Sequence, residues 1–176
     1  MRSRIALVAL TLSGILFVGA QPALAAGRTT ESVPGHSLLP IEGTCGFTPT
    51  VTQRDPRTLN TWTDRRGAIV LQTLRTATTT QYAGGSGGTM QLDENWLVTV
   101  TPNRDGTSTI LFVGRGAIWG MDTGVGRSFF QWVTGVVVMR GSYDLKSGVF
   151  FVSSKTILGQ VTDMCDALAT GLKPRH

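Results

Sequence analysis

Residues 96–113 read WLVTVTPNRDGTSTILFV, and this stretch decides the fold. Trp96, Val98 and Val100 recur at every second position, which is the spacing of a strand with one buried face. The segment PNRDG at 102–106 contains a proline and ends in Asp-Gly, both typical of turns, and apolar residues return at 108–113. Two such runs joined by a short turn predict an antiparallel β-hairpin.

The segments on both sides of this hairpin also favour strands. Glycine accounts for 22 of 176 residues, and many glycines lie among Val, Ile, Phe and Thr, as expected for tight turns and bends in strands. We expect further strands over 48–53, 68–80, 117–121, 129–143 and 149–153. The pattern predicts an all-β fold of about seven to nine strands, as an antiparallel barrel or a two-sheet sandwich. We favour the barrel because glycines such as Gly135 and Gly141 would let long strands bend.

One short helix is expected at the C-terminal end. Thr162 is a suitable N-cap, Asp163 favours the first turn, and Met164 and Leu168 share one face. Gly171 suits the C-terminal cap. Residues 45–172 are therefore predicted to be a single β domain that ends in this helix.

The N-terminal residues have the three parts of a secretory signal peptide. Arg2 and Arg4 precede an apolar run over 5–20, and the small-x-small ending Ala23-Leu24-Ala25 follows. We expect cleavage after Ala25, or after Ala26, and a secreted or envelope-associated protein. A permanent anchor is the alternative, but this run is shorter than the roughly 20 apolar residues that an anchor needs. No second run could anchor the processed chain, and residues 26–44 are expected to be an extended, partly mobile lead-in.

The sequence contains two cysteines, Cys45 and Cys165. In an exported chain such a pair predicts a disulfide, and two free buried thiols are the alternative. Two cysteines with only His36 and His176 do not make a zinc site, so no metal is expected.

Several functional classes lack their sequence signals. Removal of Arg2 and Arg4 lowers the formal net charge of +5 by two, to about +3, and no basic run interleaved with aromatic residues indicates nucleic-acid binding. A glycosidase needs two carboxylates that face each other across the bond it cleaves. Asp93 and Glu94 are adjacent, so on a strand they would point to opposite faces and could not form that pair. We interpret them as part of a solvated loop. No catalytic residue and no cofactor are predicted.

The chain resembles a group of small exported actinobacterial proteins. The resemblance rests on Cys45-Gly46-Phe47 after a proline-containing lead-in and on Asp163-Met164-Cys165 with Leu168 near the end. Met164 stands where that group usually has valine. The resemblance implies export and a chain of β-strands joined by glycine-containing turns, and it assigns no functional residue.

The function that we expect is non-catalytic binding of an apolar or lipid-like ligand inside the barrel. The candidate ligand-binding residues are Trp96, Val98, Val100, Phe130 and Trp132, because each set has the even spacing of one strand face. A structural or interaction module that contacts another envelope protein is the first alternative, and an enzyme of unrecognised type is the second. An apolar cavity would favour ligand binding, a filled core with an exposed patch would favour the module, and carboxylates meeting in a cleft would favour the enzyme.

Overall fold

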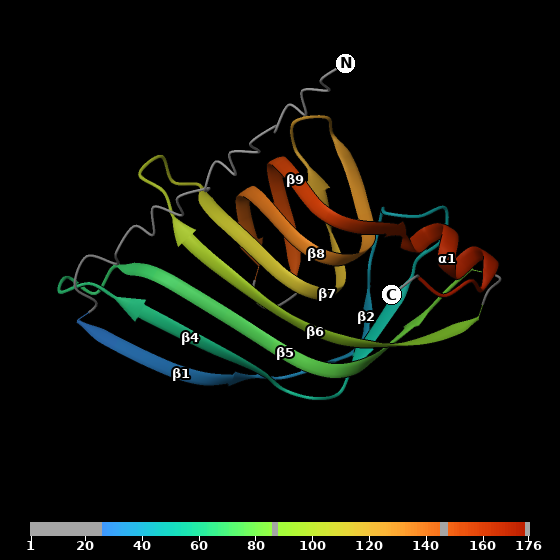
Figure 1. Ribbon diagram of the computed structural model, residues 1–176, viewed down its shortest axis with the longest axis horizontal. Coiled ribbons are helices and arrows are strands. Elements are labelled where there is room, and N and C mark those ends of the chain that lie inside the picture. Colours follow the sequence, from blue (N-terminus) through green and yellow to red (C-terminus); the bar gives the residue numbers. More distant parts are fainter. Residues whose placement is uncertain (1–25, 86–87, 145–147, 175–176) are drawn as a thin grey trace, which may run out of the picture.

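The computed structural model describes residues 26–85, 88–144 and 148–174, so the predicted signal peptide at 1–25 lies outside the described residues. The described chain forms nine strands and one helix (Figure 1). The elements are β1 (Gly27–Val33), β2 (His36–Pro40), β3 (Thr50–Gln53), β4 (Arg57–Thr63), β5 (Ile69–Ala83), β6 (Thr89–Pro102), β7 (Ser108–Asp122), β8 (Arg127–Asp144), β9 (Val149–Asp163) and α1 (Met164–Thr170). The all-β prediction with one C-terminal helix is confirmed.

The hairpin predicted at 96–113 is the junction of β6 and β7. The two strands pair antiparallel, with Val98 opposite Phe112 and Val100 opposite Ile110. The separate strand expected over 117–121 is instead the continuation of β7, because this strand runs without a break through Gly114 and Gly116.

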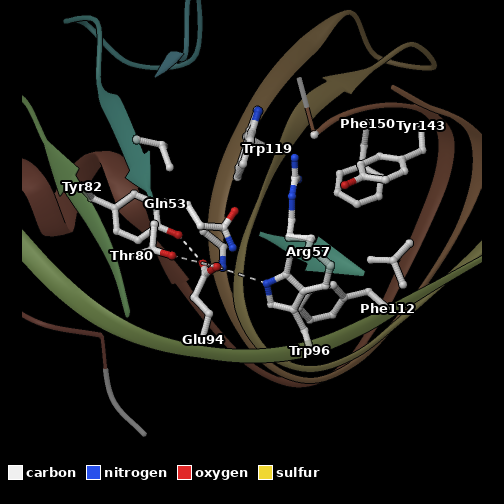
Figure 2. Close-up of a pocket in the computed structure, with 14 residues that line it drawn as sticks. Gln53, Arg57, Thr80, Tyr82, Glu94, Trp96, Phe112, Trp119, Tyr143 and Phe150 are labelled. Atoms are coloured by element: carbon white, nitrogen blue, oxygen red, sulfur yellow. Dashed lines mark hydrogen bonds between the residues drawn. The ribbon is translucent and has the colours of Figure 1, made fainter. Parts of the chain in front are cut away.

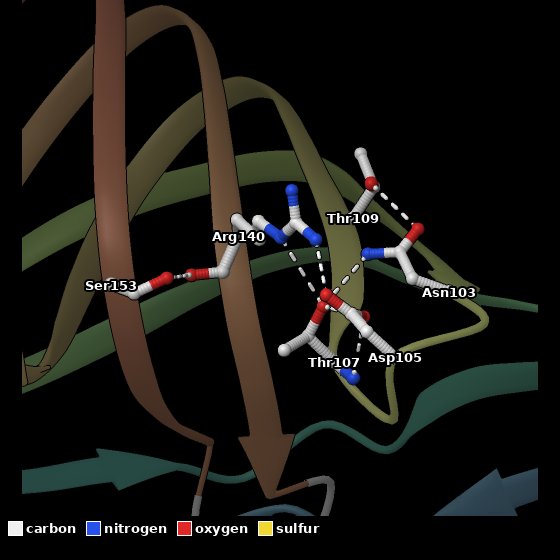
Figure 3. A network of polar contacts seen from close by, with 6 residues as sticks. All are labelled: Asn103, Asp105, Thr107, Thr109, Arg140 and Ser153. Carbon is white, nitrogen blue, oxygen red and sulfur yellow. Dashed lines mark hydrogen bonds and ion pairs between the residues drawn. The ribbon is translucent and has the colours of Figure 1, made fainter.

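A polar network at the tip of this hairpin holds it against β8 (Figure 3). Arg140 on β8 forms an ion pair with Asp105 and donates from Nε to Thr107 Oγ1 over 3.3 Å. Asn103 Nδ2 donates to the same hydroxyl over 3.0 Å, and Thr107 Oγ1 donates to Asp105 Oδ1 over 2.6 Å. The turn is therefore fixed to a strand more than thirty residues further along the chain.

Three glycines lie side by side across β7, β8 and β9. Gly114 is opposite Gly135, and Gly135 is opposite Gly159. Their φ angles lie between 131° and 143°, a region that disfavours residues with a Cβ. A Cβ at Gly135 would lie 2.2 Å from the carbonyl oxygen of Leu158, so the strands approach too closely for a side chain. We call these residues the glycine row, and one of them is Gly135, the position at which the sequence predicts a bend.

The strands form one coiled sheet that does not close into a barrel. The order is β1-β4-β5-β6-β7-β8-β9, and β3 joins β2 to the far end of β5. Beyond Arg115, β7 is no longer paired with β6, and residues 119–122 of β7 instead pair in parallel with the beginning of β9. Among the described strands, only β7, β8 and β9 are thus linked in a ring, and the sheet does not form the closed barrel that we favoured from the sequence.

Coiling of the sheet creates two apolar cores. The first core lies on the inner face of β4–β9 and includes Trp96, Val98, Phe112 and Val137. The second core lies beside α1 and includes Tyr82, Phe130, Trp132 and Met164. Both faces of β8 are covered near residues 129 and 130, because Phe129 belongs to the first core and Phe130 to the second.

The predicted disulfide is present, and it fastens α1 beside the second core. Cys45 and Cys165 are bonded, and 120 residues separate them along the chain. Gly171 forms the C-terminal cap as expected, but the N-cap is Asp163 rather than Thr162. The carboxylate of Asp163, the last residue of β9, accepts hydrogen bonds from the backbone N–H groups of Cys165 and Asp166.

The segment expected to be a lead-in contributes two strands to the sheet. All seven residues of β1 pair with β4, from Gly27 opposite Thr63 to Val33 opposite Arg57. β2 pairs with β3. The sheet therefore begins at Gly27 rather than near Cys45.

Candidate functional site

The five predicted ligand-binding residues are all buried, but the structure divides them between the two cores. Trp96, Val98 and Val100 share the inner face of β6 and belong to the first core. Phe130 and Trp132 belong to the second core, next to α1. The even spacing thus correctly placed the residues of each strand on one face of that strand. The residues of β6 and those of β8 nevertheless line different cores and do not form one binding surface.

Trp96 and Val98 border a small cavity inside the coiled sheet, which we call the inner pocket (Figure 2). Seven strands contribute to its wall, and the principal lining residues are Gln53, Arg57, Tyr82, Glu94, Trp96, Trp119, Tyr143 and Phe150. The free space is about 10 Å³, which holds about one water molecule. The inner pocket is therefore too small for an apolar ligand.

Glu94 accepts hydrogen bonds from four groups around the inner pocket. It is 5% exposed, and its Oε2 accepts hydrogen bonds from Thr80 Oγ1 over 3.1 Å and from Trp96 Nε1 over 3.2 Å. Its Oε1 accepts hydrogen bonds from the backbone N–H of Ala117 over 3.1 Å and from the Tyr82 hydroxyl. Glu94 therefore links β5, β6 and β7 at the place where β7 leaves β6.

Burial sets the protonation of this group. Desolvation raises the pKa of the Glu94 carboxyl above its usual value, and the hydrogen bonds from Tyr82, Ala117, Trp96 and Thr80 oppose the rise. Burial also raises the pKa of the Tyr82 hydroxyl, and the adjacent Glu94 carboxylate adds to the rise. Tyr82 consequently remains a proton donor to Glu94 at physiological pH.

Two further polar side chains are buried around the same cavity. Arg57 is 2% exposed and donates from one terminal nitrogen to the carbonyl oxygen of Pro34 over 3.4 Å. Gln53 is 4% exposed and donates to Thr76 Oγ1 over 2.8 Å. Figure 2 shows the Arg57 side chain crossing the pocket between the Glu94 group and the stacked rings of Tyr143 and Phe150. The inner pocket thus combines an acid, a cation and an amide with aromatic walls.

A larger cavity, which we call the outer cleft, lies on the other side of Trp119. Its free space is about 210 Å³. Most of its lining is apolar, and the residues are Pro40, Ile41, Glu42, Thr44, Trp119, Gly120, Met121, Ser128, Val149 and Phe151. Val149 and Phe151 line this cleft whereas Phe150, between them, lines the inner pocket. Trp119 and the beginning of β9 are therefore the wall between the two cavities.

Sequence reasoning missed most of these residues. Asp93 and Glu94 were interpreted as part of a solvated loop, but both lie on β6, with Asp93 exposed and Glu94 buried. The sequence did indicate the burial of Glu94, because Glu94 is two residues before Trp96 and therefore shares the same face of the strand. The burial of Arg57 and Gln53 had no such signal, since their position depends on how β3 and β4 meet the rest of the sheet.

Comparisons with protein-family models, with curated proteins and with solved structures found no match. Within residues 26–174, apart from the gaps at 86–87 and 145–147, no three His, Cys, Asp or Glu side chains are grouped so that they could hold a metal ion. No helix in this part of the chain is long and apolar enough to span a membrane.

Proposed function

We propose that the protein binds a small apolar molecule in the outer cleft and does not transform it. The observation that supports this most directly is the size and lining of the cleft, about 210 Å³ bordered by Trp119, Met121, Val149 and Phe151. An apolar cavity of roughly 150 Å³ is enough to bind benzene. The outer cleft therefore suits a substituted aromatic ring or a short branched alkyl group.

The charge at the cleft favours a neutral ligand. Glu42 is the one charged residue among the described residues that line it. A carboxylate on the ligand would be repelled by Glu42, and it would lose hydration without gaining a cation from the lining. We therefore expect a neutral molecule to bind better than the corresponding fatty acid.

We also propose that the protein is exported from the cytoplasm and binds its ligand outside it. The predicted leader and the disulfide both suit the oxidising space outside the cytoplasm. N-terminal sequencing of protein from the culture medium or the envelope should find Ala26 or Gly27 first. Recovery of an intact chain that starts at Met1 would contradict export by cleavage.

A pair of matched substitutions tests the cleft. Met121 in the cleft and Val138 on the outer face of β8 are both strand residues, 43% and 41% exposed. Met121→Lys should weaken the binding of ethylbenzene at least tenfold, whereas Val138→Lys should leave it unchanged. Calorimetric titration with ethylbenzene should give a dissociation constant between about 10 µM and 1 mM. Absence of binding to the unmodified protein would refute the proposal.

A second observation favours the alternative of an interaction module. One row of apolar residues crosses the outer face of the sheet, with Leu97 opposite Val113, Val113 opposite Val136 and Val136 opposite Leu158. Leu97 and Val113 are each about 40% exposed, and Leu158 is 62% exposed. Such a patch fits an apolar strand or helix of another envelope protein. A photo-crosslinker at Val113 should then yield a discrete protein adduct in the native host, and one at the exposed Arg75 should not.

A further inference from the structure

The outer cleft and the inner pocket are separated by little more than one side chain. The indole of Trp119 lines both cavities, and it is only half-buried. Its neighbours are Phe130, at 6.4 Å between ring centroids in an edge-on arrangement, and Gly148, where an added Cβ would lie 3.0 Å from the ring. Trp119 therefore lies between the two cavities, with Gly148, which has no side chain, packed against the outer ring of its indole.

The polar groups behind Trp119 are mainly hydrogen-bond donors. The guanidinium of Arg57 carries donors alone and the Gln53 amide adds two more, whereas both oxygens of Glu94 already accept hydrogen bonds from neighbouring groups. Burying such groups costs folding free energy, and their replacement by an apolar side chain of similar volume often leaves stability unchanged or raises it. An arrangement of this kind at the end of an apolar cleft is typical of a binding site that recognises one polar atom.

The free space of the inner pocket limits what that atom can be. About 10 Å³ accommodates one water or one oxygen atom, but not the two oxygens of a carboxylate. A carbonyl oxygen has lone pairs for the donors of the pocket and brings no charge to be buried. A ketone or ester oxygen therefore fits both the space and the chemistry.

We propose that the ligand is a small apolar molecule with one neutral carbonyl oxygen, whose body lies in the outer cleft and whose oxygen enters the inner pocket beside Trp119. The oxygen occupies the free space of the inner pocket and accepts a hydrogen bond from the Arg57 guanidinium. This inference rests on the proposed function, because it assigns the orientation of a ligand that the outer cleft must first bind.

Acetophenone and ethylbenzene test the inference, since they match in shape and differ mainly in the carbonyl oxygen. The readout is the indole N–H signals of Trp119 and Trp96 in nuclear magnetic resonance spectra, assigned with Trp→Phe variants. Trp119 borders the outer cleft, whereas the indole N–H of Trp96 donates to Glu94 inside the pocket. Both compounds should shift Trp119, only acetophenone should shift Trp96, and acetophenone should bind about three- to tenfold more tightly, as expected for one hydrogen bond.

The outcomes separate the two proposals. Equal affinities with an unchanged Trp96 signal would overturn the carbonyl assignment and leave apolar binding in the cleft intact. An unchanged Trp119 signal with both compounds would overturn both proposals.

A variant of the inner pocket gives a second measurement. Arg57→Met removes the buried donors and keeps much of the side-chain volume, and Arg75→Met on the exposed face of β5 is the matched control. Arg57→Met should bind acetophenone and ethylbenzene with about equal affinity, whereas Arg75→Met should keep the preference for acetophenone. Ethylbenzene affinity and the four indole signals verify that the variant is folded. A preserved preference in folded Arg57→Met would contradict the role assigned to Arg57.

Discussion

Replacement of Glu94 by glutamine keeps the shape of the side chain but mismatches its hydrogen bonds. Trp96 Nε1 donates to one carboxylate oxygen and the Ala117 backbone N–H donates to the other, and neither donor can become an acceptor. The NH₂ of glutamine must face one of them, whichever way the amide is turned. One buried donor is then left without an acceptor, which costs about 1–3 kcal/mol.

The cost of Glu94→Gln should depend on pH. Because burial raises the pKa of Glu94 above its usual 4.5, the folded protein holds the proton more tightly than the unfolded chain does. The stabilisation by Glu94 is therefore complete below pH 4.5 and is lost as the pH rises through the folded-state pKa. The difference in unfolding free energy between the unmodified protein and Glu94→Gln should accordingly be largest near pH 4 and smaller at pH 7 to 8.

Urea unfolding at pH 4, 5, 6, 7 and 8 measures this difference directly. Asp93→Asn is the matched control, because Asp93 precedes Glu94 on β6 and is exposed. It should change the unfolding free energy by about 0.5 kcal/mol or less. If the cost of Glu94→Gln is constant or grows with pH, the reasoning that burial favours the protonated form of this carboxyl is refuted.

The remaining predictions concern the disulfide, the glycine row and the hairpin tip. Changing both Cys45 and Cys165 to serine should lower the unfolding free energy by about 2–5 kcal/mol, because the bond closes a loop of 120 residues; an unchanged denaturation midpoint would contradict this. Gly135→Ala should cost about 1–3 kcal/mol more than Gly126→Ala in chemical denaturation, since both glycines have positive φ but only Gly135 has a carbonyl oxygen 2.2 Å from the added Cβ. The Asp105 carboxyl should titrate with a pKa of about 2 in carbon-13 spectra, because the Thr107 hydroxyl and then the Arg140 guanidinium donate to it. Its contribution to stability is present above pH 3.8 and is lost as the pH falls through 2, and a pKa that stays near 3.8 would rule out the network.

The parts of the fold that the sequence predicted well depend on short-range patterns. The hairpin of β6 and β7 and the cap at Gly171 follow from spacing and turn residues close together in the chain. The disulfide followed from the cysteine count. By contrast, β1 has little periodicity of its own, and it is a strand because β4 offers it a partner 24 to 36 residues away.

The candidate site was harder to predict because it depends on the coiling of the whole sheet. Trp96 and Val98 were expected on the inner face and do border the inner pocket. Their neighbour Glu94 could have been included from its spacing, whereas the burial of Arg57 follows from the meeting of β4 with strands distant in sequence. The outer cleft combines residues 40–44 with β7 and β9, and no local pattern predicts such a meeting.

The glycine row also has a consequence for how the chain selects its strand pairing while it folds. A shift of two residues between β8 and β9 would keep every side chain on its proper face, so hydrophobic patterning alone does not exclude it. Such a shift would bring Ile157 or Val161 opposite Gly135, where the backbones now approach with no side chain between them. β-Branched residues neither adopt that backbone conformation nor fit that space. The three glycines thereby fix the register of these strands, because they destabilise shifted sheets that would otherwise bury the same apolar surface.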